Sequence, residues 1–139
     1  MGHVYEGMLD MNSDPTMADG KFGLHVEHIE MDDLQQRVDQ VTEAQTDERV
    51  ELIRHLFHFP PPGGDPLAGE VDPAELAWSA RVSIGMERLV DDFALSGLAY
   101  YYRGLDGNAH ERLACSMILG ASLSTGRGIP IAGELDLKT

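Results

Sequence analysis

Leu98-Ala-Tyr-Tyr-Tyr102 has the composition of a short buried strand, and so does Ile129-Pro-Ile-Ala132. Between these two segments, residues Glu111 to Thr125 carry apolar side chains at helical spacing: Leu113, Met117, Leu119 and Leu123. A strand, a helix and a second strand in this order are typical of a parallel strand pair, because parallel neighbours need a crossover connection. We therefore predict a parallel unit over the last part of the chain.

Polar side chains follow both predicted strands at their carboxyl ends. After the first strand come Asp106, Asn108, His110 and Glu111, and after the second come Glu134 and Asp136. The carboxyl ends of parallel strands are where α/β proteins place their ligands. Acidic oxygens that converge at one edge suit a hard divalent cation. The pattern thus indicates a ligand site at this edge of the sheet.

Upstream, the sequence predicts a series of helices. A short helix or turn is expected over Thr16–Phe22, and Asp32 and Asp33 open a second helix towards Val38. Thr42, with Gln45 three residues later, resembles a capping box before a third helix. The apolar stripe of that helix is formed by Val50, Ile53, Leu56 and Phe57. The proline-rich stretch that follows is predicted to be a surface loop over residues 60–72.

The clearest helix signal begins at Asp72. Asp72 is an N-cap, Pro73 occupies the first helical position, and Glu75 stands where a capping-box acid belongs. The helix should run to about Leu95, and Gly97 should then supply a left-handed exit.

Two further strands complete the expected fold. His3–Met8 and Leu24–Glu30 have the patterns of short strands, the second of them half-buried. The predicted order is therefore β-α-β-α-α-β-α-β, which is typical of an α/β fold with a Rossmann-like parallel sheet and helices on both faces. The last strand has no covering helix after it, so one apolar face would stay exposed. We therefore expect the fold to be incomplete and the chain to be a fragment.

Composition excludes some classes of partner. The 139 residues suffice for one domain with a core, and the hydrophobic content of 42% with 24% charged residues is ordinary for a globular protein. A net charge of −14 argues against nucleic acid and against anionic membranes. No apolar run approaches the roughly 20 residues of a membrane span, and no secretory signal is visible at Met1. The single Cys115 is expected to be packed and reduced, which favours a cytoplasmic protein.

The two ends of the chain resemble a known family. Tyr100-Tyr-Tyr-Arg-Gly-Leu-Asp-Gly-Asn-Ala-His-Glu-Arg112 and Arg127-Gly-Ile-Pro-Ile-Ala-Gly-Glu-Leu-Asp-Leu-Lys-Thr139 are similar to segments of the L-arabinose isomerases, which belong with the L-fucose isomerases. Gly2-His-Val-Tyr-Glu-Gly-Met-Leu-Asp10, followed by Asp14-Pro-Thr16, resembles the start of that family's central domain. The resemblance implies that residues 1–139 are a single central-domain segment of a sugar isomerase.

The same resemblance implies a site and a reaction. Glu134 lies in a Gly-Glu-x-Asp-x-Lys-Thr segment whose Glu is a metal ligand in the family, so Glu134 is expected to bind a divalent metal, Mn²⁺, and to act in catalysis. Met8 corresponds to a substrate-facing methionine, although a core methionine is the alternative. The implied reaction interconverts L-arabinose and L-ribulose, or a similar sugar, by proton transfer through an enediol. The full-length protein is expected to be a homo-oligomer.

Other interpretations stay open at this point. Without the resemblance, an acid after a strand is most often an N-cap or a solvated loop residue, and Glu111 has a good structural role as a first-turn acid. The resemblance supports neither Glu111 nor Asp106 as a site residue, because the family's second metal-binding Glu lies downstream of the Gly-Glu segment, and Asp106 is the weaker candidate of the two. The pairs His25/His28 and His55/His58 do not predict zinc.

Two other functions remain possible. The alternative to a fragment of a metal-dependent isomerase is a catalytically inactive Rossmann-like binding or assembly module. A small-sugar binder similar to a lobe of the periplasmic binding proteins is a third option, which the missing signal peptide disfavours.

Overall fold

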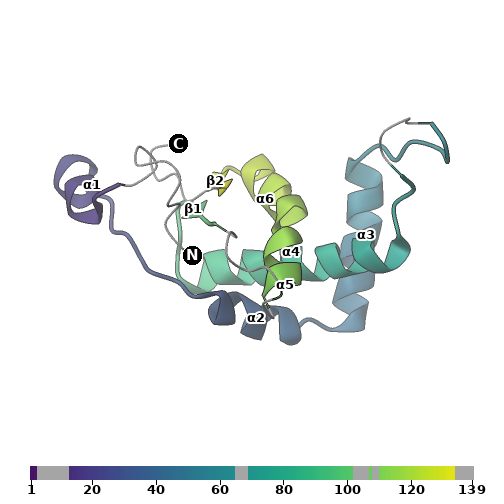
Figure 1. Ribbon diagram of the computed structural model, residues 1–139, viewed down its shortest axis with the longest axis horizontal. Coiled ribbons are helices and arrows are strands. Elements are labelled where there is room, and N and C mark those ends of the chain that lie inside the picture. Colours follow the sequence, from purple (N-terminus) through teal and green to yellow (C-terminus); the bar gives the residue numbers. More distant parts are fainter. Residues whose placement is uncertain (3–12, 65–68, 102–106, 108–109, 134–139) are drawn as a thin grey trace.

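The computed structural model describes residues 1–2, 13–64, 69–101, 107 and 110–133 (Figure 1). Most of the described residues are helical, and a small parallel sheet completes them. The elements are, in chain order, α1 (Pro15–Phe22), α2 (Met31–Asp39), α3 (Glu43–Leu56), α4 (Pro73–Asp92), β1 (Leu98–Ala99), α5 (Glu111–Cys115), α6 (Met117–Gly126) and β2 (Ile131–Ala132).

The predicted parallel pair is confirmed. β1 and β2 run parallel, with Leu98 opposite Ile131 and Ala99 opposite Ala132. The start of the chain lies along the other edge of β1, where Gly2 forms a parallel bridge with Tyr101. Both strands are shorter than the sequence indicates. A mixed α/β class agrees with this arrangement, while the larger Rossmann-like sheet stays a prediction.

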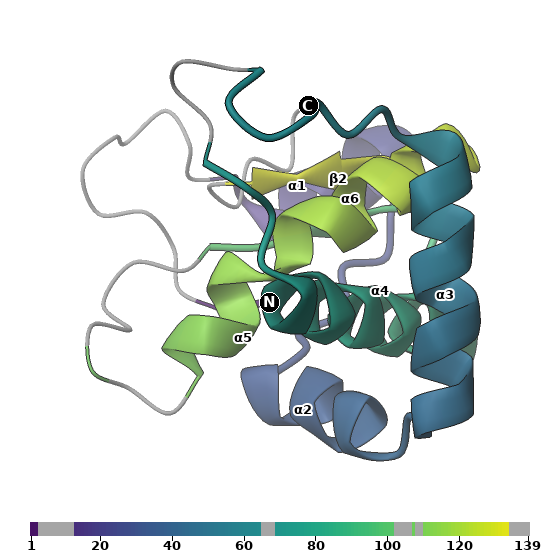
Figure 2. The ribbon, with the colours of Figure 1, turned by 90° about the vertical axis from the view of Figure 1, so that its right-hand side faces the viewer.

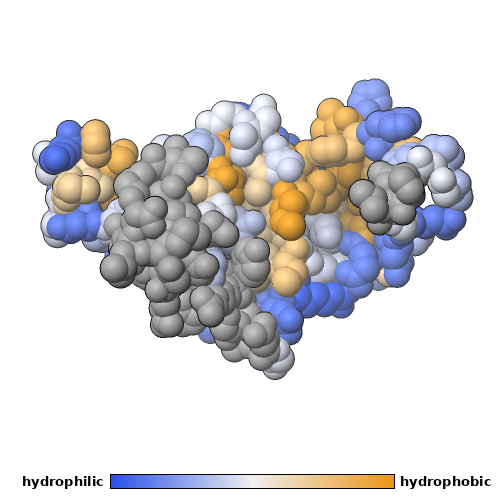
Figure 3. Space-filling view, turned by 45° about the horizontal axis from the view of Figure 1, so that its top comes forward, coloured by the Kyte–Doolittle hydropathy of each residue, from blue (hydrophilic) through white to orange (hydrophobic). Residues whose placement is uncertain are grey.

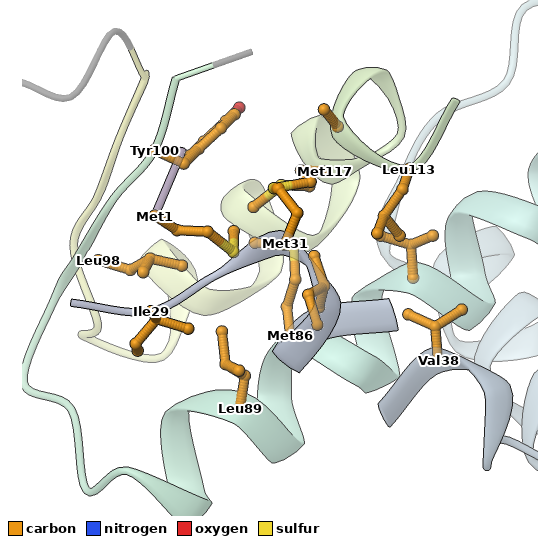
Figure 4. Packing of buried hydrophobic residues seen from close by; sticks show 13 residues of the cluster. Met1, Ile29, Met31, Val38, Met86, Leu89, Leu98, Tyr100, Leu113 and Met117 are labelled. Atoms are coloured by element: carbon orange, nitrogen blue, oxygen red, sulfur yellow. The ribbon is translucent and has the colours of Figure 1, made fainter. Parts of the chain in front are cut away.

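Helix α4 is the centre of the helical part. α2, α3 and α6 each pack against it, so that α4 lies between α2 and α6 while α3 crosses beside them (Figure 2). Its buried side chains meet those of the neighbouring helices and of β1, and four methionines gather in this core (Figure 4). These are Met1, Met31, Met86 and Met117. Methionine fills irregular gaps well, which suits a core where several elements converge.

The capping signals in the sequence are largely correct. Thr42 Oγ accepts from the Gln45 backbone N–H at 3.3 Å, and Gln45 Oε1 accepts from the Thr42 backbone N–H at 3.1 Å. Asp72 Oδ1 accepts from the Ala74 backbone N–H at 2.8 Å, as an N-cap should. Glu75, however, forms an ion pair with Arg112 of α5 at 3.1 Å, so that acid contributes to a contact between α4 and α5.

The end of α4 differs from the prediction. The helix ends at Asp92, and the left-handed residue is Ala94, with φ of 50°, instead of Gly97. The backbone N–H of Leu95 then bonds back to the Val90 carbonyl at 2.9 Å, and the Leu95 side chain packs against the core. Burial of Leu95 offsets the modest cost of a left-handed alanine. Gly97 serves close packing, because a Cβ there would lie 3.3 Å from Pro130 Cγ.

Two other predictions need correction. Leu24–Glu30 forms no strand; Leu24 and Val26 would share one strand face and Ile29 the other, and only Ile29 is buried. The predicted helix over 111–125 is divided into α5 and α6 at Ser116. The Ser116 hydroxyl donates to the Arg112 carbonyl at 2.7 Å, the type of back-bonding that bends helices. Predicted strand His3–Met8 lies outside the described residues.

Helices α2 and α4 approach closely at Gly85. A Cβ added to Gly85 would lie 2.5 Å from Val38 Cγ2 and 3.2 Å from the Val38 backbone nitrogen. Arg81, one turn earlier on α4, donates from Nε to the Val38 carbonyl at 3.0 Å, near the end of α2, where the Val41 N–H also donates to that carbonyl. The pair of helices is therefore held by backbone proximity as well as by side-chain packing.

Apolar side chains also reach the surface. In Figure 3, orange apolar areas lie beside blue polar ones. Of the predicted stripe on α3, Ile53 is buried, but Leu56 and Phe57 are exposed, as is Ile118 on α6. In the part of the chain that the structure describes, none of the helices has the length and apolar character that crossing a membrane requires.

Candidate functional site

The carboxyl ends of β1 and β2 form the candidate site. The Leu98 N–H donates to the Pro130 carbonyl at 3.0 Å, and the Tyr100 N–H donates to the Ala132 carbonyl at 2.9 Å. Because the two strands are parallel and in register, their carboxyl ends lie side by side, and the chain leaves both strands at the same end of the sheet. The exposed Gly133 ends the described part of the chain at this edge.

Most of the predicted site residues lie outside the described residues. These are Glu134, Met8, Asp106, Asn108 and Asp136. The described chain reaches Gly133, which directly precedes Glu134 in the sequence.

Glu111 has a structural partner. It is the first residue of α5, and its Oε2 accepts from the Gly107 backbone N–H at 2.9 Å. The carboxylate thus satisfies a donor in the preceding turn and stands in the first turn of its helix, where a negative charge is favourable. This is the structural role that the sequence offered as the alternative to a site role.

A side-chain contact that the sequence did not predict joins α2 to the start of α5. His110 Nε2 lies 3.1 Å from Asp32 Oδ1, while the neighbouring Asp33 accepts from the Glu30 backbone N–H at 2.9 Å. Asp33 therefore caps its own helix, whereas Asp32 contacts a residue far away in the sequence. No local sequence pattern predicts the contact between Asp32 and His110.

A metal site is not complete in the described part of the chain. Within it, no three His, Cys, Asp or Glu side chains lie close enough together to hold an ion. His25 is strongly exposed and lies 3.2 Å from Glu27. A Glu134 carboxylate suits Mn²⁺ as an oxygen donor, but a single carboxylate does not hold the ion. These residues alone therefore do not fit a manganese centre, and further ligands are needed.

Cys115 differs from its prediction. The thiol was expected to be packed, yet Cys115 is exposed on α5. Its helix neighbours Leu113 and Ala114 occupy the buried face, so the register of the helix turns Cys115 outward.

The amino group of Met1 takes the place of a strand N–H on the free edge of β1. It donates to the Ala99 carbonyl at 2.9 Å, and the Tyr101 N–H donates to the Met1 carbonyl at 3.2 Å. Burial lowers the pKa of this ammonium group from its ordinary value of 8.0, and the negative charge of Glu30 opposes that shift.

The lowered pKa predicts a pH dependence for a polypeptide that begins at Met1. Between the folded-state pKa and the ordinary value of 8.0, the unfolded chain binds more protons than the folded chain. The free energy of unfolding should therefore rise as the pH increases towards 8.0 and gain nothing more from this group above it. Urea unfolding from about pH 6 to about pH 9 measures the effect. The N-terminally acetylated chain is the control, and an identical slope in both forms would contradict the assignment.

A comparison with protein families gives one finding. The family model for the L-arabinose isomerase central domain matches residues 10–120 of this chain, which covers α1 to α5 and the start of α6. Met8 and Glu134 lie outside the matched residues. No curated protein matches the chain.

Proposed function

The chain belongs to the L-arabinose isomerase central-domain family, and we propose that it is part of an aldose–ketose isomerase to which it contributes Glu134. The observation that carries the proposal is the family match over residues 10–120, which spans most of the chain. The parallel pair of β1 and β2 supports it, because Gly133 leads into the Gly-Glu segment at the edge where α/β proteins bind ligands.

The proposed reaction converts L-arabinose into L-ribulose, or acts on a similar sugar. Isomerisation moves a proton between adjacent carbons through an enediol, and a carboxylate can take and return that proton. Glu134 is proposed for this role and as a ligand of a divalent metal. In the complete site Mn²⁺ would stabilise developing negative charge on the sugar oxygens. The remaining ligands are proposed to come from outside the described residues.

We also propose the Rossmann-like sheet as the architecture of the complete domain. The support is that three parallel segments already lie side by side: the one at Gly2, then β1, then β2. A cytoplasmic location and a homo-oligomeric enzyme belong to the same proposal and rest on the family.

The proposal is tested on a longer isomerase polypeptide that includes this domain and the downstream ligands. We expect it to form L-ribulose from L-arabinose, to lose that activity on treatment with a chelator, and to regain it with Mn²⁺. The 139-residue chain is the control and is expected to be inactive. A longer protein that binds Mn²⁺ but isomerises neither L-arabinose nor a related sugar would rule the proposal out.

One observation favours the second candidate, an assembly module without catalysis. Leu56 at the end of α3, Phe57 directly after it and Ile118 on α6 are exposed apolar side chains, and contacts with a partner could cover them. Sedimentation of the chain measures whether it self-associates. Self-association that Leu56→Ser or Ile118→Ser abolishes would support assembly through these side chains, and a monomer at all concentrations would count against it.

A further inference from the structure

Glu87 on α4 is the centre of an ionic network that ends next to β2. One carboxylate oxygen, Oε2, accepts from Arg49 Nη2 of α3, and the other, Oε1, pairs with Arg127 Nη1 just after α6. Arg49 also donates to Ser83 Oγ at 3.3 Å. The network therefore connects α3, α4 and the turn that enters β2.

The buried Arg49 makes its pair with Glu87 stronger than a surface ion pair. The Arg49 side chain is 13% exposed, that of Glu87 32% and that of Arg127 47%, against 60% and 59% for the surface pair Arg112–Glu75. Burial lowers the pKa of Arg49, so its charge is costly without a counter-ion. Arg49 thereby holds the Glu87 carboxylate in place, and Glu87 presents a fixed oxygen to Arg127.

The turn before β2 is also held by its own backbone. The N–H groups of Arg127 and Ile129 both donate to the Ser124 carbonyl at 3.0 Å, and that of Gly128, which adopts a φ of 87°, donates to the Thr125 carbonyl at 3.0 Å. β2 itself has only two residues and is attached to β1 along one edge. A strand this short gains little stability from its own hydrogen bonds to β1. An ion pair directly before the strand therefore has a large influence on its position.

We propose that the Arg49–Glu87–Arg127 network positions β2 and, through it, Gly133, the residue directly before Glu134. Arg127 is a positioning residue in this scheme: it touches no reacting group and acts through the strand that follows it. The role in catalysis rests on the proposed function, whereas the hold on β2 does not.

Hydrogen exchange tests the hold on β2 in the 139-residue chain. The amides of Leu98 and Tyr100 donate to Pro130 and Ala132, so their exchange reports the opening of β2. Arg127→Gln should speed exchange of both amides about fivefold while amides in the middle of α4 keep their protection. Arg127→Lys should restore part of the protection that Leu98 and Tyr100 lose. Arg112→Gln, which removes the surface pair with Glu75, is the matched control and should leave both amides unchanged. Unchanged exchange in Arg127→Gln would overturn the proposal.

Activity of the longer isomerase tests the catalytic consequence. Arg127→Gln should lower kcat more than it raises KM, with a melting temperature close to that of the wild type, because the sugar-binding groups remain and the position of Glu134 is lost. An active wild type with an unaffected Arg127→Gln variant would overturn the positioning role. An inactive wild type would instead count against the proposed function, and the exchange data would still decide whether the network holds β2.

Discussion

Replacing Gly85 by valine is expected to lower the free energy of unfolding by about 3 kcal/mol, about a 100-fold change in the folding equilibrium. The reason is the crossing of α2 and α4, where even a Cβ at Gly85 would meet both the side chain and the backbone of Val38. Val38 is fully buried, so it has no free space to move into. α2 would have to shift away from α4.

Chemical denaturation of the purified variant measures this loss. Gly20→Val is the matched control, because Gly20 lies within α1 and no atom comes within 4 Å of an added Cβ there. Valine has a better helix propensity than glycine, so the control should be neutral or stabilised by up to about 0.5 kcal/mol. Equal effects of the two substitutions would show that backbone propensity, and not the helix crossing, decides the outcome at Gly85.

Replacing Glu134 by glutamine is expected to reduce kcat/KM of the longer isomerase by at least about 100-fold. An amide has almost the shape of the carboxylate but cannot take up a proton or supply a full negative charge to a divalent metal. The same variant should also bind Mn²⁺ more weakly, which titration of the protein with the metal measures without any turnover.

Glu111→Gln is the control for this second prediction. The amide oxygen of glutamine can still accept from the Gly107 N–H, so the turn before α5 is kept while the charge is removed. Activity should stay within about threefold of the wild type. Full activity of the Glu134→Gln variant would show that Glu134 has no catalytic role. A large loss of activity in the Glu111→Gln variant would show that Glu111 belongs to the site after all.

Local interactions made part of this fold predictable. Thr42 and Gln45 bond to each other's backbone, and Asp72 bonds to the backbone of Ala74, so short sequence patterns sufficed for the starts of α3 and α4. The parallel pairing of β1 with β2 was also predictable, since a helical crossover separates the two strands, although it is divided into α5 and α6.

Contacts between distant elements explain what the sequence did not reveal. Glu75 fits a capping box by position but pairs with Arg112, and Ala94 takes the left-handed conformation because Leu95 is drawn into the core. The partners of Glu87 on α3 and after α6 follow no periodic pattern. For the candidate site, the sequence and the family resemblance named Glu134. The structure adds the position of Gly133, the preceding residue, at the carboxyl end of β2.

The order of the strands has a consequence for how the chain folds. The ammonium group of Met1 and the Ala99 carbonyl are 98 positions apart in the chain, and β2 follows later still. Closing so long a loop costs more chain entropy than forming a helix, whose bonds are local. Helices α2, α3 and α4 can collapse on one another while the rest of the chain is still being synthesised. The complete sheet has to wait for β2, so its assembly is a late step, and until then the edge of β1 that takes β2 remains free to pair with another chain.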